Sequence, residues 1–386
     1  MFEEKALISD GEISAAMDFA VSQVLRDLPE FTDKFQKPYS ENGFYRPIDN
    51  VEWTTGFWTG EIWLAYEWCQ DERLKKAGEI QVLDFLKRIK EKNHVDHHDM
   101  GFLYSPSCVA AYKLTGNLKG REAAILAADQ LISRFHPKGE FLQAWGPMDQ
   151  PENYRLIIDC LLNLPLLYWA SEETGDEKYR TVAEKHLHTA MANVIREDAS
   201  TWHTFYFNME TGAPDHGATC QGYKDDSAWA RGQAWGIYGS ALAYRYTGED
   251  RYMESFERVL GYYLAHLPGD MVPFWDLSFT DGDDQPRDSS SASIAACGLL
   301  EMARYLKEGK KERCMRLARQ MMKALCDHYA VKDASVSNGL VLHSTYSNHS
   351  PYNTCRHEGV DECNSWGDYF YMEALTRLAK DWKPYW

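Results

Sequence analysis

A short recurring pattern restricts the fold of this chain more than any other feature of the sequence. An apolar run of helical character is followed by a turn with glycine and then by a charged, amphipathic run. Clear copies lie at 110–118, 168–179 and 243–252, and weaker copies lie at 65–74 and 303–312. Glycine suits the position that ends a helix, and an acidic residue directly after it suits the start of the next helix. Each copy therefore predicts two helices joined by a short turn.

Hydrophobic periodicity extends this pattern to about twelve helices. The expected ranges are 12–27, 56–69, 72–92, 103–114, 118–134, 151–173, 176–194, 226–246, 249–266, 290–305, 309–330 and 365–380. Residues 155–170 are apolar on nearly every side, as a buried helix is, whereas 176–194 is apolar on one side only. This alternation predicts an all-α fold, an (α/α)6 barrel of inner and outer helices. Strand-like alternation is confined to short stretches such as 201–208 and 339–346.

No linker or low-complexity segment divides the chain, so we predict one catalytic domain over residues 1–386. Three long loops are expected, at 195–225, 267–289 and 331–364, and they are rich in glycine, aspartate, histidine and aromatic residues. Loops of that length in a compact domain usually carry function.

Charge and composition exclude several classes of partner. The formal net charge of −17 disfavours nucleic acids and anionic membranes. No apolar stretch is long enough to span a membrane, and the first residues, MFEEKALISDGE, lack the features of a secretion signal. The nine cysteines form no CxxC pair, which favours a reduced protein over a disulfide framework or a zinc site. We therefore expect a cytoplasmic protein without nucleic-acid or membrane partners.

An aspartate in an apolar segment is the first candidate for catalysis. Asp159 lies in RLIIDCLLNLPLLYWA, which we expect to be a helix with Asp149 as its cap and Pro151 in its first turn. Arg155 is its only neighbour in the sequence with an opposite charge. Burial would raise the pKa of Asp159, as a general acid requires. The alternative is a structural aspartate bonded to the backbone.

A second carboxylate lies in the segment HVDHHDMGFLY, at residues 94–104. Its three histidines and two aspartates match no strong metal-binding template, so we expect no metal and a polar loop that leads into an inner helix. Asp99 is then the natural partner of Asp159. Two carboxylates in one site separate their pKa values, which leaves one protonated and the other charged.

A third group of candidates lies between residues 202 and 235. Arg231 stands where a helix of small residues begins, and an unpaired cation is unfavourable there. It needs either a structural aspartate, such as Asp225 or Asp226, or the carboxylate of a substrate, which suits a guanidinium group. His203 and Gln221 carry polar groups able to reach a sugar. Trp145 and Trp235 carry aromatic rings that either stack on a sugar or pack in the core.

Six sequence segments together resemble a known family. They are HDMGFLY, RLIIDCLLNLPLLYWA, SAWARGQAWGIYG, VPFWDL with RDSSSASIAA, and NSWGDYFYMEAL. From about Trp53 to the C-terminus they resemble, in the same order, the unsaturated glucuronyl hydrolases of glycoside hydrolase family 88. The fold of that family is an (α/α)6 barrel, in agreement with the helix pattern. The resemblance implies a hydrolase that releases terminal 4,5-unsaturated glucuronic acid from lyase-generated glycosaminoglycan disaccharides of the chondroitin or hyaluronan type.

The resemblance also implies roles for individual residues. It places the catalytic aspartate on Asp159 and the second essential aspartate on Asp99. The substrate-binding residues that it implies are His203, Gln221, Arg231, Trp235, Trp145 and His98. Streptococcal members bind a sulfate through a Ser-x-x-Ser-x-Lys loop; here Ser347 and Ser350 are in place, whereas Tyr352 stands at the lysine position and Arg356 is a candidate substitute.

The implied reaction is hydration of the sugar double bond without a metal or an organic cofactor. Protonated Asp159 would supply a proton to carbon four and then activate a water molecule, while a charged Asp99 orients the sugar. The expected partner is a small anionic unsaturated disaccharide, and the protein is expected to be a monomer or a homodimer. Three alternatives stay open: an unsaturated rhamnogalacturonyl hydrolase acting on pectin fragments, an (α/α)6 sugar epimerase, and a non-catalytic carbohydrate-binding protein.

Overall fold

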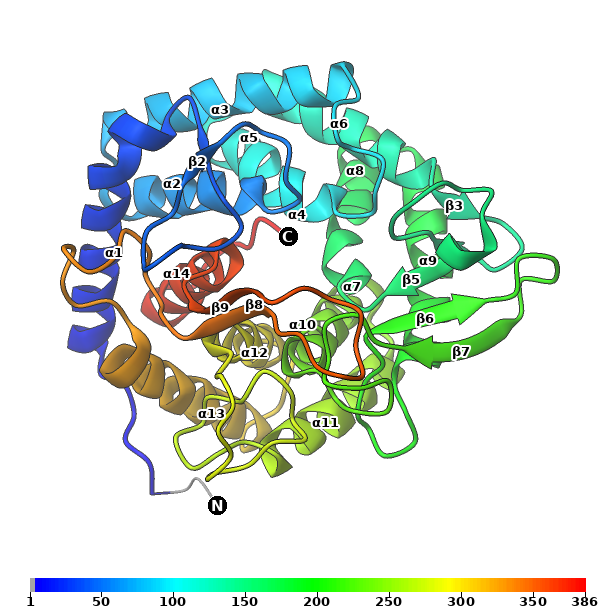
Figure 1. Ribbon diagram of the computed structural model, residues 1–386. Helices are drawn as coiled ribbons and strands as arrows, with labels where there is room; N and C mark the ends of the chain where they lie inside the picture. The colour runs from blue at the N-terminus through cyan, green and yellow to red at the C-terminus, as the bar shows by residue number, and fades with distance from the viewer. Residues whose placement is uncertain (1–3) are drawn as a thin grey trace.

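Two concentric layers of helices form a ring around one axis in the computed structural model, which describes residues 4–386 (Figure 1). The outer layer consists of α1 (Asp10–Phe31), α3 (Glu72–Lys90), α6 (Leu118–Ile132), α9 (Glu177–Val194), α11 (Asp250–Ala265) and α13 (Lys310–Ala324). The inner layer consists of α2 (Thr55–Cys69), α4 (Met100–Tyr104), α5 (Ala110–Thr115), α7 (Cys160–Asn163), α8 (Pro165–Thr174), α10 (Ala230–Thr247), α12 (Ser289–Met302) and α14 (Ser365–Ala379). The last inner helix, α14, packs against both α2 and α12 and closes the ring. The predicted (α/α)6 barrel is therefore confirmed.

The two layers differ in burial as the sequence predicts. Every residue of the inner helix α12 is buried. The outer helix α13 buries mainly one face, with Cys314, Leu317, Ala318 and Met321 against the inner layer. A helix surrounded by other helices must be apolar on all sides, whereas an outer helix keeps a solvated face.

The glycine turns of the recurring pattern end inner helices. Gly116, Gly175 and Gly248 follow α5, α8 and α10, with left-handed φ angles of 70°, 74° and 68°. Glycine adopts this conformation without a steric penalty. Asn117 and Asp176 come next and cap the following outer helices, because their side chains accept hydrogen bonds from backbone N–H groups. The predicted hairpins are confirmed at these turns.

The predicted helix 151–173 is wrong in its first half. Residues Pro151–Asn153 form a 3₁₀ turn, Arg155–Ile157 form strand β5, and the helix begins only at Cys160. The apolar run of β5 pairs with β6 (Thr204–Phe207), a segment more than forty residues away. Asp149 therefore caps no helix here, and Asp159 lies at the residue before α7 instead of inside a helix.

Short strands and a few irregular turns complete the chain. The remaining strands are β1 (Phe35–Gln36), β2 (Pro47–Ile48), β3 (Phe135–His136), β4 (Phe141–Leu142), β7 (Pro214–Ala218), β8 (Ser344–Ser347) and β9 (Glu358–Glu362), with π-helical turns at Ser105–Val109 and Leu325–Tyr329. Strands β5, β6 and β7 form one antiparallel sheet, and β8 pairs with β9. Strand β8 lies against the start of α12, where the hydroxyls of Ser289 and Ser344 are 2.7 Å apart. The strand-like stretches expected at 201–208 and 339–346 correspond to β6 and β8.

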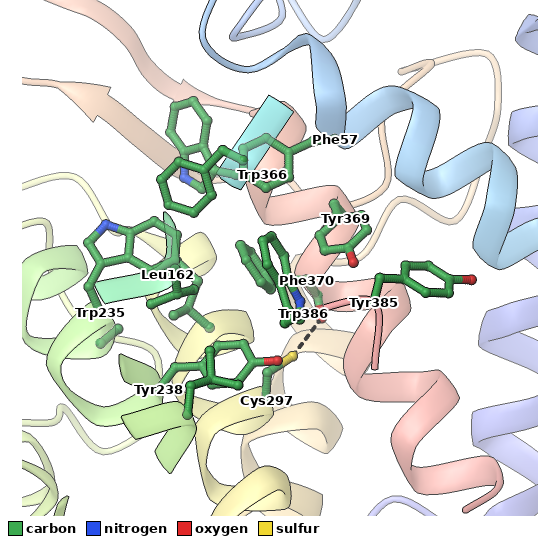
Figure 2. Close-up of a cluster of buried hydrophobic side chains, with 14 of the residues drawn as sticks. Phe57, Leu162, Trp235, Tyr238, Cys297, Trp366, Tyr369, Phe370, Tyr385 and Trp386 are labelled. Carbon is green, nitrogen blue, oxygen red and sulfur yellow. Dashed lines mark hydrogen bonds between the residues drawn. The ribbon is translucent and has the colours of Figure 1, made fainter. Parts of the chain in front are cut away.

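Aromatic side chains fill the centre of the ring (Figure 2). The indole of Trp386 is fully buried, stacks on Phe370 at 5.8 Å and donates to Glu373 at 2.6 Å. All nine cysteines are free thiols, and that of Cys297 donates to the Phe370 carbonyl in this cluster. Within residues 4–386, no helix combines the length and apolar character needed to span a bilayer.

Candidate active site

Three acidic residues directly precede inner helices. Asp99 precedes α4, Asp159 precedes α7 and Asp288 precedes α12. An aspartate at this position usually caps its helix through its side chain. None of these three side chains makes such a bond. All three carboxyl groups are therefore available for other partners.

Asp99 and Asp159 meet around His98. The Nε2 atom of His98 lies 3.3 Å from Oδ1 of Asp99 and 3.4 Å from Oδ1 of Asp159. The Asp159 side chain is 16% exposed, while the other two are almost completely buried. These three facing atoms have no hydrogen-bond partner within residues 4–386. Buried polar atoms without partners are unfavourable, so a bound ligand is the natural partner of this group.

The environment raises the pKa of both carboxyl groups. Burial raises the pKa of Asp159 well above its usual range, Asp99 adds to this effect, and the cation of Arg231 opposes it. Burial also raises the pKa of Asp99, to about 8, although the neighbouring amide of Asn163 opposes the shift. Asp159 therefore keeps its proton more strongly than Asp99 does, as a general acid requires. Burial favours the neutral form of Asp99 as well, which is opposite to the expected charged form.

The same three groups could also hold a cation, because one ligand atom from each lies within 4.8 Å of the others. Fixed positive charge already acts on them, from Arg231 on Asp159 and from Arg134 and Arg88 on Asp99. Like charges repel, so this surrounding charge favours protons over a metal ion here. We assign no metal to the group.

The hydrogen bonds of His203, which precedes β6, define its protonation state. Its Nδ1 accepts backbone N–H groups of Cys220 at 3.0 Å and Gln221 at 3.2 Å. The hydrogen of the neutral ring must then be on Nε2. Burial, helped by Arg231, lowers the pKa of His203 to about 3. His203 is therefore a neutral donor through Nε2.

Gln221 connects this loop to β8. Its amide nitrogen donates to the carbonyl of Tyr346 at 3.0 Å, so its side-chain oxygen remains able to accept from a sugar hydroxyl. The hydroxyl of Tyr346 in turn accepts from the indole of Trp53 at 3.2 Å. Trp53 stacks on Trp366 at 5.3 Å. Trp53, Trp366 and Tyr346 therefore form a connected aromatic group beside Gln221.

Arg231 lies in the first turn of α10 and has a protein counter-ion. Its Nη1 lies 3.0 Å from Oδ2 of Asp288 and donates to the Thr345 carbonyl at 2.6 Å. Its Nη2 donates to the Tyr346 carbonyl at 2.7 Å. These bonds use three of the five N–H groups of a guanidinium. Two remain without a protein partner within residues 4–386.

The expected structural partners of Arg231 are wrong. Asp225 accepts the backbone N–H of Thr219 at 2.8 Å, and Asp226 pairs with Lys224 at 3.1 Å. Closeness in sequence does not bring either of them to Arg231, because the start of α10 lies beside the start of α12.

The two tryptophans that the sequence singles out have different environments. Trp145 is 38% exposed, with one face stacked on His97 at 4.3 Å and an interplanar angle of 6°. Trp235 is 1% exposed and packs against Phe102 and Phe370 (Figure 2). Trp145 can therefore offer a ring face to a sugar, whereas Trp235 lies in the core; a direct role of either residue in binding stays a prediction.

The two serines expected to hold a sulfate have internal partners. Ser347 donates to the carbonyl of Arg356 at 2.7 Å, and Ser350 donates to the carbonyl of Tyr223 at 2.5 Å. A hydroxyl has one hydrogen to donate, and a sulfate oxygen can only accept. In this arrangement neither serine has a hydrogen left for a sulfate.

Sequence reasoning missed Asp288, His97, Trp53 and Tyr346. One signal was available for Asp288: like Asp159, it stands before an apolar inner helix, in the segment RDSSSASIAA. His97 was noticed only as one of the three histidines of HVDHHDMGFLY, without a role of its own. For Trp53 and Tyr346 the sequence offers no comparable signal, since their importance depends on contacts with distant segments.

The fold and the carboxyl pair define a helical-barrel glycoside hydrolase. The model of Glycosyl Hydrolase Family 88 matches residues 28–380, and the chain belongs to this family. It is 48% identical to the unsaturated chondroitin disaccharide hydrolase of Streptococcus pneumoniae (strain ATCC BAA-255 / R6), over 100% of this chain and 96% of that relative. It is 41% identical to the unsaturated glucuronyl hydrolase of Bacillus sp. (strain GL1), over 96% and 98% of the two chains.

A solved structure agrees closely with this fold. The crystal structure of unsaturated glucuronyl hydrolase from Streptococcus agalactiae superposes with a TM-score of 0.96 at 47% identity, covering 100% of this chain and 96% of that one. The predicted family is confirmed.

Proposed function

We propose that this enzyme hydrolyses unsaturated chondroitin or hyaluronan disaccharides and releases the terminal 4,5-unsaturated glucuronic acid. The observation that carries the proposal is the buried group of Asp159, His98 and Asp99, whose facing atoms lack protein partners. The names of the family relatives support the substrate class: three are unsaturated chondroitin disaccharide hydrolases at 47–48% identity. Nothing in the site favours the pectin-directed or epimerase alternatives.

The double bond between carbons four and five of the sugar is a vinyl ether, and it reacts by hydration. Asp159, held protonated by burial, donates its proton to carbon four. Positive charge then develops between carbon five and the ring oxygen. The Asp159 carboxylate takes a proton from a water molecule as that water attacks carbon five. The product is a hemiketal, which opens and releases the second sugar with its hydroxyl group restored.

The remaining site residues position the substrate in this proposal. Neutral His203 donates from Nε2, and Gln221 accepts through its side-chain oxygen. The two free N–H groups of Arg231 suit the carboxylate of the uronate, since a guanidinium binds carboxylates through paired hydrogen bonds. Trp145 offers its exposed face to a sugar ring.

Sulfation of the second sugar is expected to matter little to this enzyme. A variant of the S. agalactiae relative has been solved in complex with dGlcA-GalNAc6S. Here the hydroxyls of Ser347 and Ser350 are already used, Tyr352 is 61% exposed at the lysine position, and Arg356 extends into solvent. We therefore expect similar kcat/KM values for unsulfated and 6-sulfated disaccharides.

The test follows the ultraviolet absorbance of the conjugated double bond while the protein acts on unsaturated chondroitin disaccharides. Wild type should abolish the absorbance with or without a chelator, and Asp159→Asn should not. Unsaturated rhamnogalacturonan disaccharides serve as the comparison substrate. Faster loss of absorbance with the pectin fragment would refute the substrate, and full activity in Asp159→Asn would refute the mechanism.

Two finer predictions accompany this function. We expect the enzyme to work in the cytoplasm on imported disaccharides, which cell fractionation would test. We expect a monomer or a homodimer, which light scattering of the purified protein would distinguish from larger assemblies.

A further inference from the structure

His97 lies beside the catalytic group but has no role in the mechanism above. Its imidazole is 3% exposed and lies flat against the indole of Trp145. It touches Asp99 on one edge and its own loop on the other. The hydrogen bonds of this ring determine where its hydrogen lies.

The contacts of His97 select one tautomer. Its Nε2 lies 3.1 Å from the carbonyl oxygen of His94, which can only accept, so Nε2 carries a hydrogen. The backbone N–H of Asp99 donates to Nδ1 at 3.1 Å, so Nδ1 offers its lone pair. His97 is therefore neutral, with its hydrogen on Nε2.

This tautomer restricts the state of the Asp99 side chain. Oδ2 of Asp99 lies 3.1 Å from the same Nδ1. An ionised carboxylate there would place two lone pairs against each other, which is repulsive. A hydrogen on Oδ2 converts the contact into a hydrogen bond. The other oxygen, Oδ1, faces His98 without a hydrogen of its own.

We propose that His97 is a positioning residue: it holds the proton of Asp99 on Oδ2 and so keeps Oδ1 as a bare acceptor facing Asp159 and the substrate. The position of the Asp99 proton follows from the structure alone. Its consequence for catalysis rests on the proposed function. Asp99 then acts as a neutral carboxylic acid of fixed orientation. Without His97, the proton could occupy either oxygen or leave.

Charged neighbours act against this protonated state. The groups that face His97 and Asp99 are Arg88 from α3, Arg134 at the end of α6, Asp159 before α7, and Asp96 and His98 from their own loop. Arg88 donates to the same His94 carbonyl at 2.6 Å, so its cation is close. Both arginines favour an ionised Asp99. The acceptor on His97 and the burial of Asp99 oppose them.

His97→Gln tests the inference through the pH profile. A glutamine amide can turn its N–H toward Asp99 and stabilise the ionised form, which lowers the pKa of that carboxyl. In the proposal the neutral form of Asp99 is the working form, so its ionisation contributes to the alkaline limb of kcat/KM. We expect this limb to move to lower pH by about one unit, the effect of one hydrogen bond of about 1.4 kcal/mol. A purely structural role would lower the rate without moving the limb. A limb that stays in place or moves to higher pH would overturn the inference.

The matched control is His186→Gln. His186 is also a fully buried histidine whose pKa is lowered by burial, and its Nδ1 accepts the backbone N–H of Leu142 at 2.8 Å instead of facing a carboxyl group. Its substitution should leave the position of the limb unchanged. A shift equal to that of His97→Gln would overturn the inference, because the effect would then not depend on Asp99.

A second measurement is independent of activity and of any change at His97. Nitrogen NMR of histidine-labelled wild type distinguishes bare from protonated ring nitrogens. We assign His97 by the change in its signals in Trp145→Phe, which alters the ring current over the imidazole. A bare Nδ1 and a protonated Nε2 near neutral pH are expected. A protonated Nδ1 would overturn the inference even if the proposed substrate is correct, and the expected pattern would stand even if that substrate is wrong.

Discussion

Replacing Asp288 with asparagine should destabilise the protein strongly, although Asp288 does not belong to the catalytic pair. Asp288 and Arg231 form an ion pair at 3.0 Å, and both side chains are at most 2% exposed. Removing one partner of a buried pair leaves the other charge without compensation and costs about 3–5 kcal/mol. At about 2.1 cal/mol/K of unfolding entropy per residue over 386 residues, the expected fall in Tm is about 4–6 °C.

A double variant separates the structural role of Arg231 from its role in binding. Arg231→Met with Asp288→Leu removes both charges, and apolar replacements of a buried pair are often neutral or stabilising. The carbonyl of Thr345 loses its donor, at about 1–3 kcal/mol, whereas the carbonyl of Tyr346 still accepts from Gln221. The double variant should therefore recover only part of the lost Tm. If Arg231 also binds the substrate carboxylate, kcat/KM should stay about 10- to 150-fold low, equivalent to about 1.5–3 kcal/mol for a charge-assisted hydrogen bond.

Thermal unfolding by circular dichroism and initial rates with the unsaturated disaccharide measure the two effects. Glu184→Gln is the control for stability, because Glu184 and Arg180 form an exposed pair at 3.3 Å that contributes at most about 1 kcal/mol. An unchanged Tm in Asp288→Asn would refute the reasoning about the buried pair. A double variant with the kcat/KM of wild type would refute a role of Arg231 in binding.

Three further substitutions test the site and its surroundings. Trp145→Ala should raise KM by about 2- to 12-fold, equivalent to about 0.5–1.5 kcal/mol of aromatic stacking, whereas Trp68→Ala on the far end of α2 should leave KM unchanged. Gly101→Ala would place its Cβ 2.4 Å from the Cα of Asn163; we expect a loss of about 1–3 kcal/mol in denaturant unfolding and a lower kcat. Burial raises the pKa of Asp27 to about 7, so the stability that its protonated form contributes is lost as pH rises from about 4 through 7. Asp27→Asn should therefore raise Tm at pH 9 and change it little at pH 4, and equal changes at both pH values would contradict this.

Local features made the hairpins predictable from the sequence. The left-handed position after a helix needs glycine for reasons internal to the backbone, so Gly116, Gly175 and Gly248 could be identified without knowing the fold. The same holds for the burial of Asp159, since its neighbours in sequence are apolar. The start of its helix could not be located in this way. Residues 155–157 fit a strand or a helix equally well, and their strand partner, β6, is distant in sequence.

The partner of Arg231 shows a different limit. Asp225 and Asp226 are close in sequence, whereas Asp288 is 57 residues away. Which aspartate reaches a buried cation depends on the order of helices around the ring, and no local pattern encodes a distance across that ring. The stack of His97 on Trp145 is hidden for the same reason.

The ring explains why the active-site residues come from separate segments. Each hairpin reverses the chain twice, so successive inner helices point in the same direction and begin at the same end of the barrel. The residues before α4, α7 and α12 therefore gather at one end whatever their separation in sequence. A side-chain cap at such a position stabilises its helix by about 1 kcal/mol, and here all three aspartates forgo that bond. The inner helices can tolerate this loss because burial on all sides, instead of capping, holds them in place. An acidic residue directly before an inner helix, without a side-chain capping bond, is thus the feature to examine first in a chain of this fold.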